Sequence, residues 1–259
     1  MAMLIDTHAH LTFNPLRKQL DNVLSRAGES GVETIITVGT TPDDSILAVE
    51  LAHSYDNIYA AIGIHPHDAD KNNNAEHLKP LLNSCKVVAI GETGLDYHYD
   101  FADRNNQCRL FESHLAIAQQ SRLPVIIHCR EAFDDVFSIL KSANGNIKGV
   151  FHCFSGSIEQ AKAVLDMGWS ISVTGILTFK NAVSLRETIK AIGLSNLLVE
   201  TDCPYMSPEP VRKNRINEPA NIKYIVEFLS ALFNLPMEKV SEILHNNTLR
   251  IFSILRKDS

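Results

Sequence analysis

Histidine and carboxylate side chains stand at the ends of short apolar segments along this chain, and their types suit metal-dependent chemistry. His8 and His10 are two residues apart after one such segment, so on a strand both imidazoles point to the same side and can reach one cation. Other segments end in Glu92, His128, His152 and Asp202. An unpaired polar group is costly to bury there. This mixed nitrogen and oxygen set suits Zn²⁺, Mn²⁺ or similar ions, and it matches two ions sharing a carboxylate better than one tetrahedral zinc.

Single members of this set also have simpler interpretations. A His-X-His pair taken alone fits a hydrogen-bonded surface pair, and His128 fits a core histidine with satisfied partners. His67 fits a residue that caps the turn after Pro66 as well as it fits a functional residue at the end of its apolar segment. Cys129 and Cys153 each follow a proposed ligand, so strand alternation turns them away from the ligand side and they are not counted as ligands.

The elements that position these residues follow from the hydrophobic pattern. Most of the apolar segments are continuous rather than alternating, which is typical of strands buried on both faces of a parallel sheet. The predicted strands are Leu4–Thr7, Glu33–Val38, Ile58–Gly63, Val87–Gly91, Val125–His128, Gly149–His152, Trp169–Val173 and Leu197–Glu200. Helical spacing predicts Pro15–Ser30, Asn106–Gln120, Ser157–Met167, Pro219–Leu232 and Pro236–Leu244.

Alternating strands and helices predict an α/β protein. Eight strands in 259 residues leave about 32 residues for each strand and its crossover helix. An open doubly wound sheet normally has a glycine-rich loop after its first strand, but Thr7-His8-Ala9-His10 contains no glycine. We therefore predict a single (β/α)₈ TIM-barrel domain over residues 1–259, with the active site at the C-terminal mouth of the strands.

Charge and cysteine content narrow the class of protein. With 24 basic and 30 acidic residues the net charge is −6, so no overall field attracts nucleic acid, and a phosphate-binding site must supply its own positive charge. The five cysteines are widely spaced without a CxxC pair, which argues against a disulfide framework or a zinc ribbon. No signal-peptide pattern and no apolar run of about 18 residues is present. We expect a cytoplasmic protein with no membrane association and no obligate protein partner.

Six ordered motifs resemble the successive signatures of the TatD-type metal-dependent deoxyribonucleases, which belong to the amidohydrolase superfamily. The motifs are Asp6-Thr7-His8-Ala9-His10-Leu11, Gly63-Ile64-His65-Pro66-His67, Gly91-Glu92-Thr93-Gly94-Leu95-Asp96-Tyr97, Pro124-Val125-Ile126-Ile127-His128-Cys129-Arg130, His152-Cys153-Phe154-Ser155-Gly156 and Glu200-Thr201-Asp202-Cys203-Pro204. The resemblance runs from residue 4 to about residue 252. It implies a TIM barrel that hydrolyses DNA phosphodiesters with divalent metals.

The resemblance also implies a division of the ligands between two metals. His8, His10 and Asp202 would bind one metal together with Glu92, which would bridge to the second metal. His128 and His152 would complete that second site. A glutamate on the fourth predicted strand, in place of a carboxylated lysine, favours the nuclease branch over the dihydroorotase-like branch.

Two departures from the family pattern leave some roles open. Thr12 stands where the family often has an acid. Residues 210–219 resemble a family Arg-Gly-Lys segment but lack its glycine, so the roles of Arg212, Lys213 and Arg215 stay open.

The predicted function is a divalent-metal-dependent deoxyribonuclease, with two ions of Mg²⁺, Mn²⁺ or Zn²⁺ and a metal-activated hydroxide. Its substrate is DNA, as single strands or ends, with 3′-5′ exonuclease action on single strands. Asp202, as general base, and Glu92 are the catalytic candidates. His65 and Arg130 are the candidates for phosphate contacts, although Arg130 also fits a salt bridge with Glu131 or Asp134.

Three aromatic residues near the predicted mouth either stack on bases of a single strand or simply anchor loops: Tyr97, Phe154 and Tyr205. One fold hosts many chemistries, so a superfamily hydrolase of a small amide, lactone or phosphoester is the alternative function. A non-catalytic metal-binding barrel is the weaker alternative.

Overall fold

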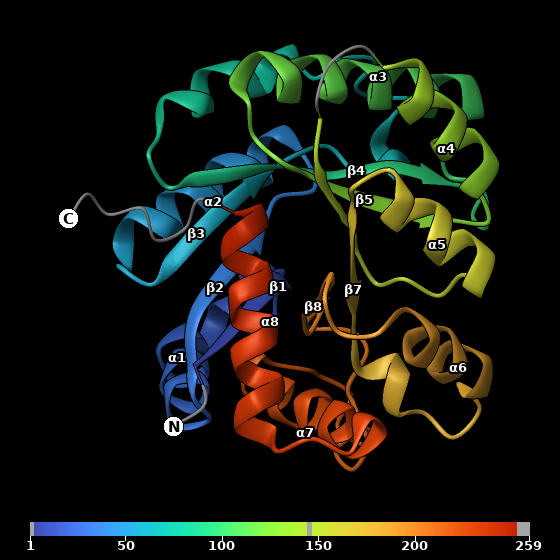
Figure 1. Cartoon of the computed structure of the whole chain (residues 1–259). Helices are drawn as coiled ribbons and strands as arrows, with labels where there is room; N and C mark the ends of the chain where they lie inside the picture. The colour runs from blue at the N-terminus through green and yellow to red at the C-terminus, as the bar shows by residue number, and fades with distance from the viewer. Residues whose placement is uncertain (1–2, 144–146, 253–259) are drawn as a thin grey trace. The chain divides into compact units, whose positions relative to one another are not determined.

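The computed structural model describes residues 3–143 and 147–252, and within them the strands form one eight-stranded sheet in sequence order, β1 to β8 (Figure 1). The strands are β1 Leu4–Ala9, β2 Val32–Val38, β3 Ile58–Ile62, β4 Val87–Asp96, β5 Val125–Arg130, β6 Gly149–Phe151, β7 Ser170–Val173 and β8 Leu197–Val199. The pairs β1–β2, β3–β4, β4–β5, β5–β6 and β7–β8 are parallel.

Helices connect the strands in alternation. They are α1 Leu20–Glu29, α2 Pro42–Ser54, α3 Arg104–Ser121, α4 Phe133–Ser142, α5 Ile158–Asp166, α6 Val183–Ile192, α7 Ile222–Phe233 and α8 Met237–Ile251. Short 3₁₀ helices are η1 Arg17–Gln19, η2 Pro66–Asp68, η3 Glu76–Asn83, η4 Gly175–Thr178 and η5 Pro219–Asn221. Sequential parallel strands with crossover helices confirm the predicted (β/α)₈ class.

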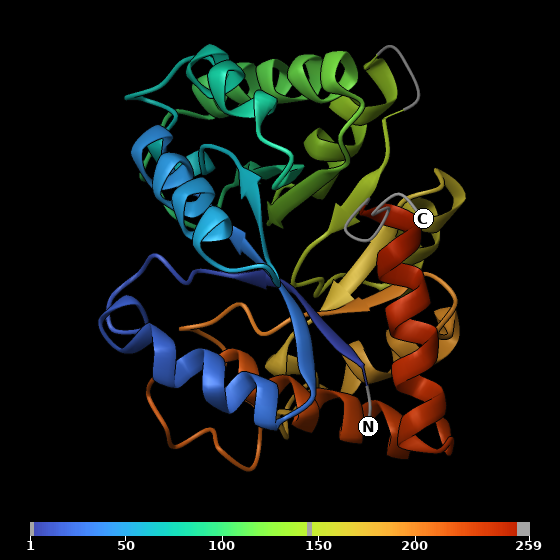
Figure 2. The same ribbon diagram turned by 90° about the vertical axis from the view of Figure 1, so that its left-hand side faces the viewer.

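The chain divides into two compact units, of which the first comprises residues 1–37 and 153–259. In this unit the first strand lies against the last: Ala9 pairs with Cys203, the His10 amide donates to the Cys203 carbonyl at 2.8 Å, and the Asp202 amide donates to the His8 carbonyl at 2.9 Å. Helix α8, red in Figure 2, packs on both β1 and β8. The segments that carry His8 and Asp202 are therefore held side by side.

The second unit comprises residues 38–152, with β3 to β6. Strand β4 pairs with β5 from Ile90 opposite Val125 to Asp96 opposite Arg130, and the register shifts between Ile90 and Thr93. Glu92 lies in this irregular stretch. Strand residues of this unit, such as Ala60, Ile90 and Ile126, are fully buried, so the strands form a rigid support for the polar side chains near their ends.

The structure moves several predicted boundaries. Strand β4 continues past Gly91 to Asp96, so Glu92 lies within the strand and not at its end. The predicted helix over Pro15–Ser30 is instead η1 followed by α1, because Gln19, at φ −133°, leaves the helical region between them. Helix α8 runs on to Ile251. The single domain over residues 1–259 stays a prediction.

Among the residues described, no helix combines the length and the apolar character that crossing a membrane requires.

Candidate metal centre

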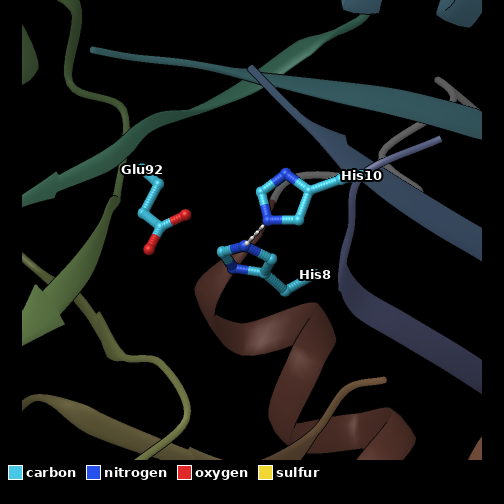
Figure 3. A group of neighbouring side chains, drawn as sticks. All are labelled: His8, His10 and Glu92. Carbon is cyan, nitrogen blue, oxygen red and sulfur yellow. Dashed lines mark hydrogen bonds between the residues drawn. The ribbon is translucent and has the colours of Figure 1, made fainter. Parts of the chain in front are cut away.

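In the first unit, three of the predicted ligands lie together. The Nε2 atoms of His8 and His10 are 3.3 Å apart (Figure 3), and Asp202 Oδ1 lies 3.8 Å from His8 Nε2 and 3.4 Å from His10 Nε2. Ligand atoms bound about 2.1 Å from a tetrahedral metal are themselves roughly 3.4 Å apart. The donor atoms of His8, His10 and Asp202 thus have the chemistry and the separations that a divalent ion requires.

A buried carboxylate on β1 holds this cluster in place. Asp6 Oδ1 accepts from the Thr201 amide at 2.9 Å and from the His8 amide at 3.3 Å, and Oδ2 accepts from Thr201 Oγ1 at 2.5 Å. Burial raises the pKa of Asp6 to about 7, against the lowering effect of these hydrogen bonds. Asp6 therefore ties the backbone before one ligand, His8, to the backbone before another, Asp202.

In the second unit, a second cluster surrounds the carboxylate of Glu92, which Figure 3 also draws. Glu92 Oε1 lies 2.8 Å from His128 Nδ1, 2.8 Å from His152 Nε2 and 3.5 Å from His65 Nε2. His152 Nε2 and His128 Nδ1 are 3.4 Å apart. Donor atoms of His65, Glu92 and His128 all lie within 4.8 Å of one another, as metal ligands do. The imidazoles of His128 and His152 and the carboxylate of Glu92 form a donor set that fits a divalent ion.

Burial and hydrogen bonding set the charges in this cluster. Burial raises the pKa of Glu92, but the electrostatic interactions with His152 and His65 and the hydrogen bonds from His128 and His152 outweigh it, so the pKa lies well below its ordinary value. Burial lowers the pKa of His65 to about 4, against the attraction of Glu92. The pKa of His128 is raised, because the bonds to Asp96 and Glu92 outweigh its burial. Glu92 is an anion and His65 is neutral at pH 7.

Asp96, at the end of β4, orients His128 from the other side of its ring. Asp96 Oδ2 accepts from His128 Nε2 at 2.9 Å and from His67 Nε2 at 3.0 Å, and Oδ1 accepts from the amides of His98 at 3.0 Å and Tyr99 at 3.2 Å. These bonds lower the pKa of Asp96 in spite of its burial. With Nε2 donating to Asp96, Nδ1 is the nitrogen of His128 that faces Glu92 and is placed to bind a metal.

The six predicted ligands therefore form two clusters, one in each unit. His8, His10 and Asp202 lie together in the first unit, and Glu92, His128 and His152 lie together in the second. The structure also brings His65, predicted to contact phosphate, into the Glu92 cluster. His67 does more than cap a turn, since its ring binds Asp96.

Among the residues that the structure describes, Arg130 forms no salt bridge with Glu131 or Asp134. Its guanidinium lies over the Tyr99 ring, 4.9 Å from the centroid, while Glu131 pairs with His98 at 2.7 Å. Of the three aromatic candidates, one is hydrogen-bonded to a neighbouring side chain and another is buried. The Tyr97 hydroxyl donates to Asp135 at 2.7 Å, and Phe154 is buried.

Tyr205, the third aromatic candidate, is half exposed and meets His10 edge to face at 6.2 Å. Glu200, the first residue of the last quoted motif, accepts from the amide of Cys153, the residue after His152, at 2.7 Å and from Ser172 Oγ at 2.7 Å. Glu200 therefore fixes the backbone next to His152, one of the predicted ligands.

Sequence reasoning missed the positioning roles of Asp6 and Asp96. Both lie inside quoted motifs, and both are acidic residues buried in strands. That conflict between polarity and burial was the available signal, because a buried carboxylate needs partners. The partners themselves come from distant segments.

The sequence of the chain matches a known protein family. The model of the TatD-related DNase family matches residues 5–253. The chain belongs to the TatD-related DNase family.

Relatives agree with this membership. The metal-dependent hydrolase YabD of Bacillus subtilis is 41% identical, over 97% of this chain and 100% of YabD. A protein of Edwardsiella piscicida named 3′-5′ ssDNA/RNA exonuclease TatD is 34% identical, over 97% of this chain and 100% of its own. The crystal structure of the TatD homologue YJJV from Escherichia coli K12 superposes with a TM-score of 0.91 at 33% identity, covering 97% of this chain and 98% of that one.

Proposed function

We propose that this protein is a divalent-metal-dependent nuclease that removes nucleotides from the 3′ ends of single-stranded DNA. The observation that carries the proposal is the pair of buried histidine–carboxylate clusters, each with donor separations that suit a metal ion. Membership of the TatD-related DNase family supports phosphodiester hydrolysis as the reaction. The relative named as a 3′-5′ ssDNA/RNA exonuclease supports the polarity and the single-stranded substrate.

In this proposal the six ligands would hold two ions of Mg²⁺, Mn²⁺ or Zn²⁺. His8, His10 and Asp202 would hold the first together with Glu92. His128 and His152 would hold the second, to which Glu92 would also contribute. Such a pair of ions, when bound, lowers the pKa of water and neutralises charge on a phosphodiester.

The protein's own groups supply the remaining steps. Asp202 accepts the proton of the attacking water on its carboxylate, and the hydrogen bond from the Asp202 amide to the His8 carbonyl fixes the backbone that carries it. His65 Nδ1 accepts from the His67 amide at 3.2 Å, so the proton of this neutral ring sits on Nε2, where it can be donated to a phosphate oxygen. Arg130 supplies a planar donor and a positive charge for the neighbouring phosphate.

A nuclease assay on variants tests this assignment. The substrate is a 5′-labelled single-stranded oligonucleotide with Mn²⁺ or Mg²⁺, and the readout is a ladder of products shortened from the 3′ end. We expect Asp202→Asn to lower kcat by about a hundredfold or more, because the substitution removes both a proposed metal ligand and the proposed general base. Asp166→Asn, at an exposed acid on α5, is the matched control and should leave kcat unchanged.

Other substrates decide between the candidate functions. If the wild-type protein leaves DNA intact but hydrolyses a small amide or lactone, the nuclease proposal is wrong and the superfamily-hydrolase alternative is correct. If it binds metal but hydrolyses neither, the non-catalytic alternative stands. The five free cysteines support action in a reducing compartment, and we propose the cytoplasm.

A further inference from the structure

Two exposed aromatic side chains lie in the segment that follows β4. Tyr99 is 41% and Phe101 61% exposed, and their rings stack with centroids 5.1 Å apart and an interplanar angle of 22°. The two rings thus form one continuous apolar surface that is open to solvent. We call Tyr99 and Phe101 the aromatic pair.

The aromatic pair is anchored to the candidate metal centre through one carboxylate. Asp96 Oδ1 accepts from the Tyr99 amide at 3.2 Å, and its Oδ2 accepts from His128 Nε2 at 2.9 Å. Asp96 is itself buried and fixed on β4. The same side chain that orients a proposed ligand therefore fixes the backbone of the aromatic pair.

A series of rings leads from the proposed ligand to the aromatic pair. The His128 and His65 centroids are 4.6 Å apart, and those of His65 and His67 are 4.2 Å apart. His67 in turn meets Phe101 at 4.7 Å and Tyr99 at 5.6 Å, edge to face in both cases. The aromatic pair therefore begins one side chain beyond His65, the proposed phosphate contact.

The charges around the aromatic pair favour one kind of occupant. The Arg130 guanidinium lies over the Tyr99 ring at 4.9 Å and offers a cation beside the apolar surface. Asp100 lies between the two aromatic residues in the sequence, and the nearby Glu131 pairs with His98. Arg130 with these acidic neighbours suits a single nucleotide and not the long phosphate track of a duplex.

We propose that the aromatic pair stacks on a nucleobase of the single strand whose phosphate is at the metal centre, with Arg130 on an adjacent phosphate. This inference rests on the proposed nuclease function. Aromatic side chains can stack on every base, because each base has a π-face. The site would therefore bind single strands without sequence preference. The stacking role is thus assigned to Tyr99 and Phe101, which are exposed, in place of Tyr97 and Phe154.

The test compares two oligonucleotides that differ only in their bases. One is an ordinary single strand, and the other carries abasic tetrahydrofuran residues at its last two 3′ positions. We expect the double variant Tyr99→Ala/Phe101→Ala to raise KM about tenfold on the ordinary strand, to change kcat less than twofold, and to leave KM on the abasic strand unchanged. Tyr99→Phe keeps the ring and should behave as wild type. Val183→Ala, 55% exposed on α6, is the control for loss of surface apolar area.

Binding separates failure of this inference from failure of the proposed function. Fluorescence anisotropy with the same two strands gives a Kd without turnover. If the wild-type protein cleaves neither strand, the nuclease proposal is wrong, and the stacking inference is judged on Kd alone: it survives only if the double variant weakens binding of the ordinary strand selectively. An equal loss on both strands, or no loss on either, overturns it. Thermal unfolding verifies that the variants are folded.

Discussion

His114, in the middle of α3, is buried as a neutral imidazole with both ring nitrogens bonded. Its Nδ1 donates to the Leu110 carbonyl at 2.8 Å, and its Nε2 accepts from the Ile64 amide at 3.1 Å. Ile64 immediately precedes His65, so this bond fixes the backbone beside the Glu92 cluster. Burial lowers the pKa of His114 to about 4, and the bond to Leu110 offsets only part of this effect.

This lowered pKa makes the stability of the protein depend on pH. Above pH 6.5 both the folded and the unfolded states hold a neutral His114, and the free energy of unfolding is unaffected. As the pH falls below 6.5, the unfolded chain takes up a proton that the folded protein excludes, so stability falls until about pH 4. The interval between these two pKa values corresponds to roughly 3 kcal/mol.

Urea unfolding of His114→Gln, metal-free in EDTA, measures this contribution. Wild type and variant are compared at pH 7.5 and pH 4.5, so that the other titrating groups cancel in the difference. We expect the variant to be less stable at pH 7.5, and its deficit to shrink by roughly 2–3 kcal/mol at pH 4.5. The exposed His77→Gln variant controls for loss of a surface histidine. A deficit that is the same at both pH values would refute the argument that His114 is held neutral.

Two further predictions concern the support of His128. Asp96→Asn removes the carboxylate that binds His128 Nε2, so Mn²⁺ affinity measured by calorimetry on metal-free protein should fall about 10–100-fold, while Asp100→Asn in the same segment should not change it. Unchanged affinity in Asp96→Asn would contradict the orienting role. Gly94→Ala should destabilise the fold by roughly 2–4 kcal/mol in urea, because Gly94 has φ +133° and a Cβ there would collide with the His128 carbonyl oxygen. Gly168→Ala, at φ +78° with open space around it, should cost only about 1–2 kcal/mol, and equal losses would show that the collision does not matter.

The alternation of strands and helices could be predicted from sequence, and the candidate ligands proposed from it, because both leave a local signal. A strand buried on both faces reads as a continuous apolar run, as Val125–Ile127 does, and a polar residue that interrupts or ends such a run is conspicuous. His8, His10 and His128 were found in this way. The extent of β4 was not, because its continuation to Asp96 depends on pairing with β5, not on its own pattern.

Only the tertiary structure decided which groups hold those ligands in place. The bond between Asp6 and Thr201 joins residues 195 positions apart, and Asp96 gathers His67, Tyr99 and His128 around one carboxylate. Such contacts depend on strand register and on side-chain direction, which no local pattern encodes. The sequence by itself determined the fold class and the chemistry of the ligands, because burial and residue type are local properties. The partners of each carboxylate emerge only when the strands are paired.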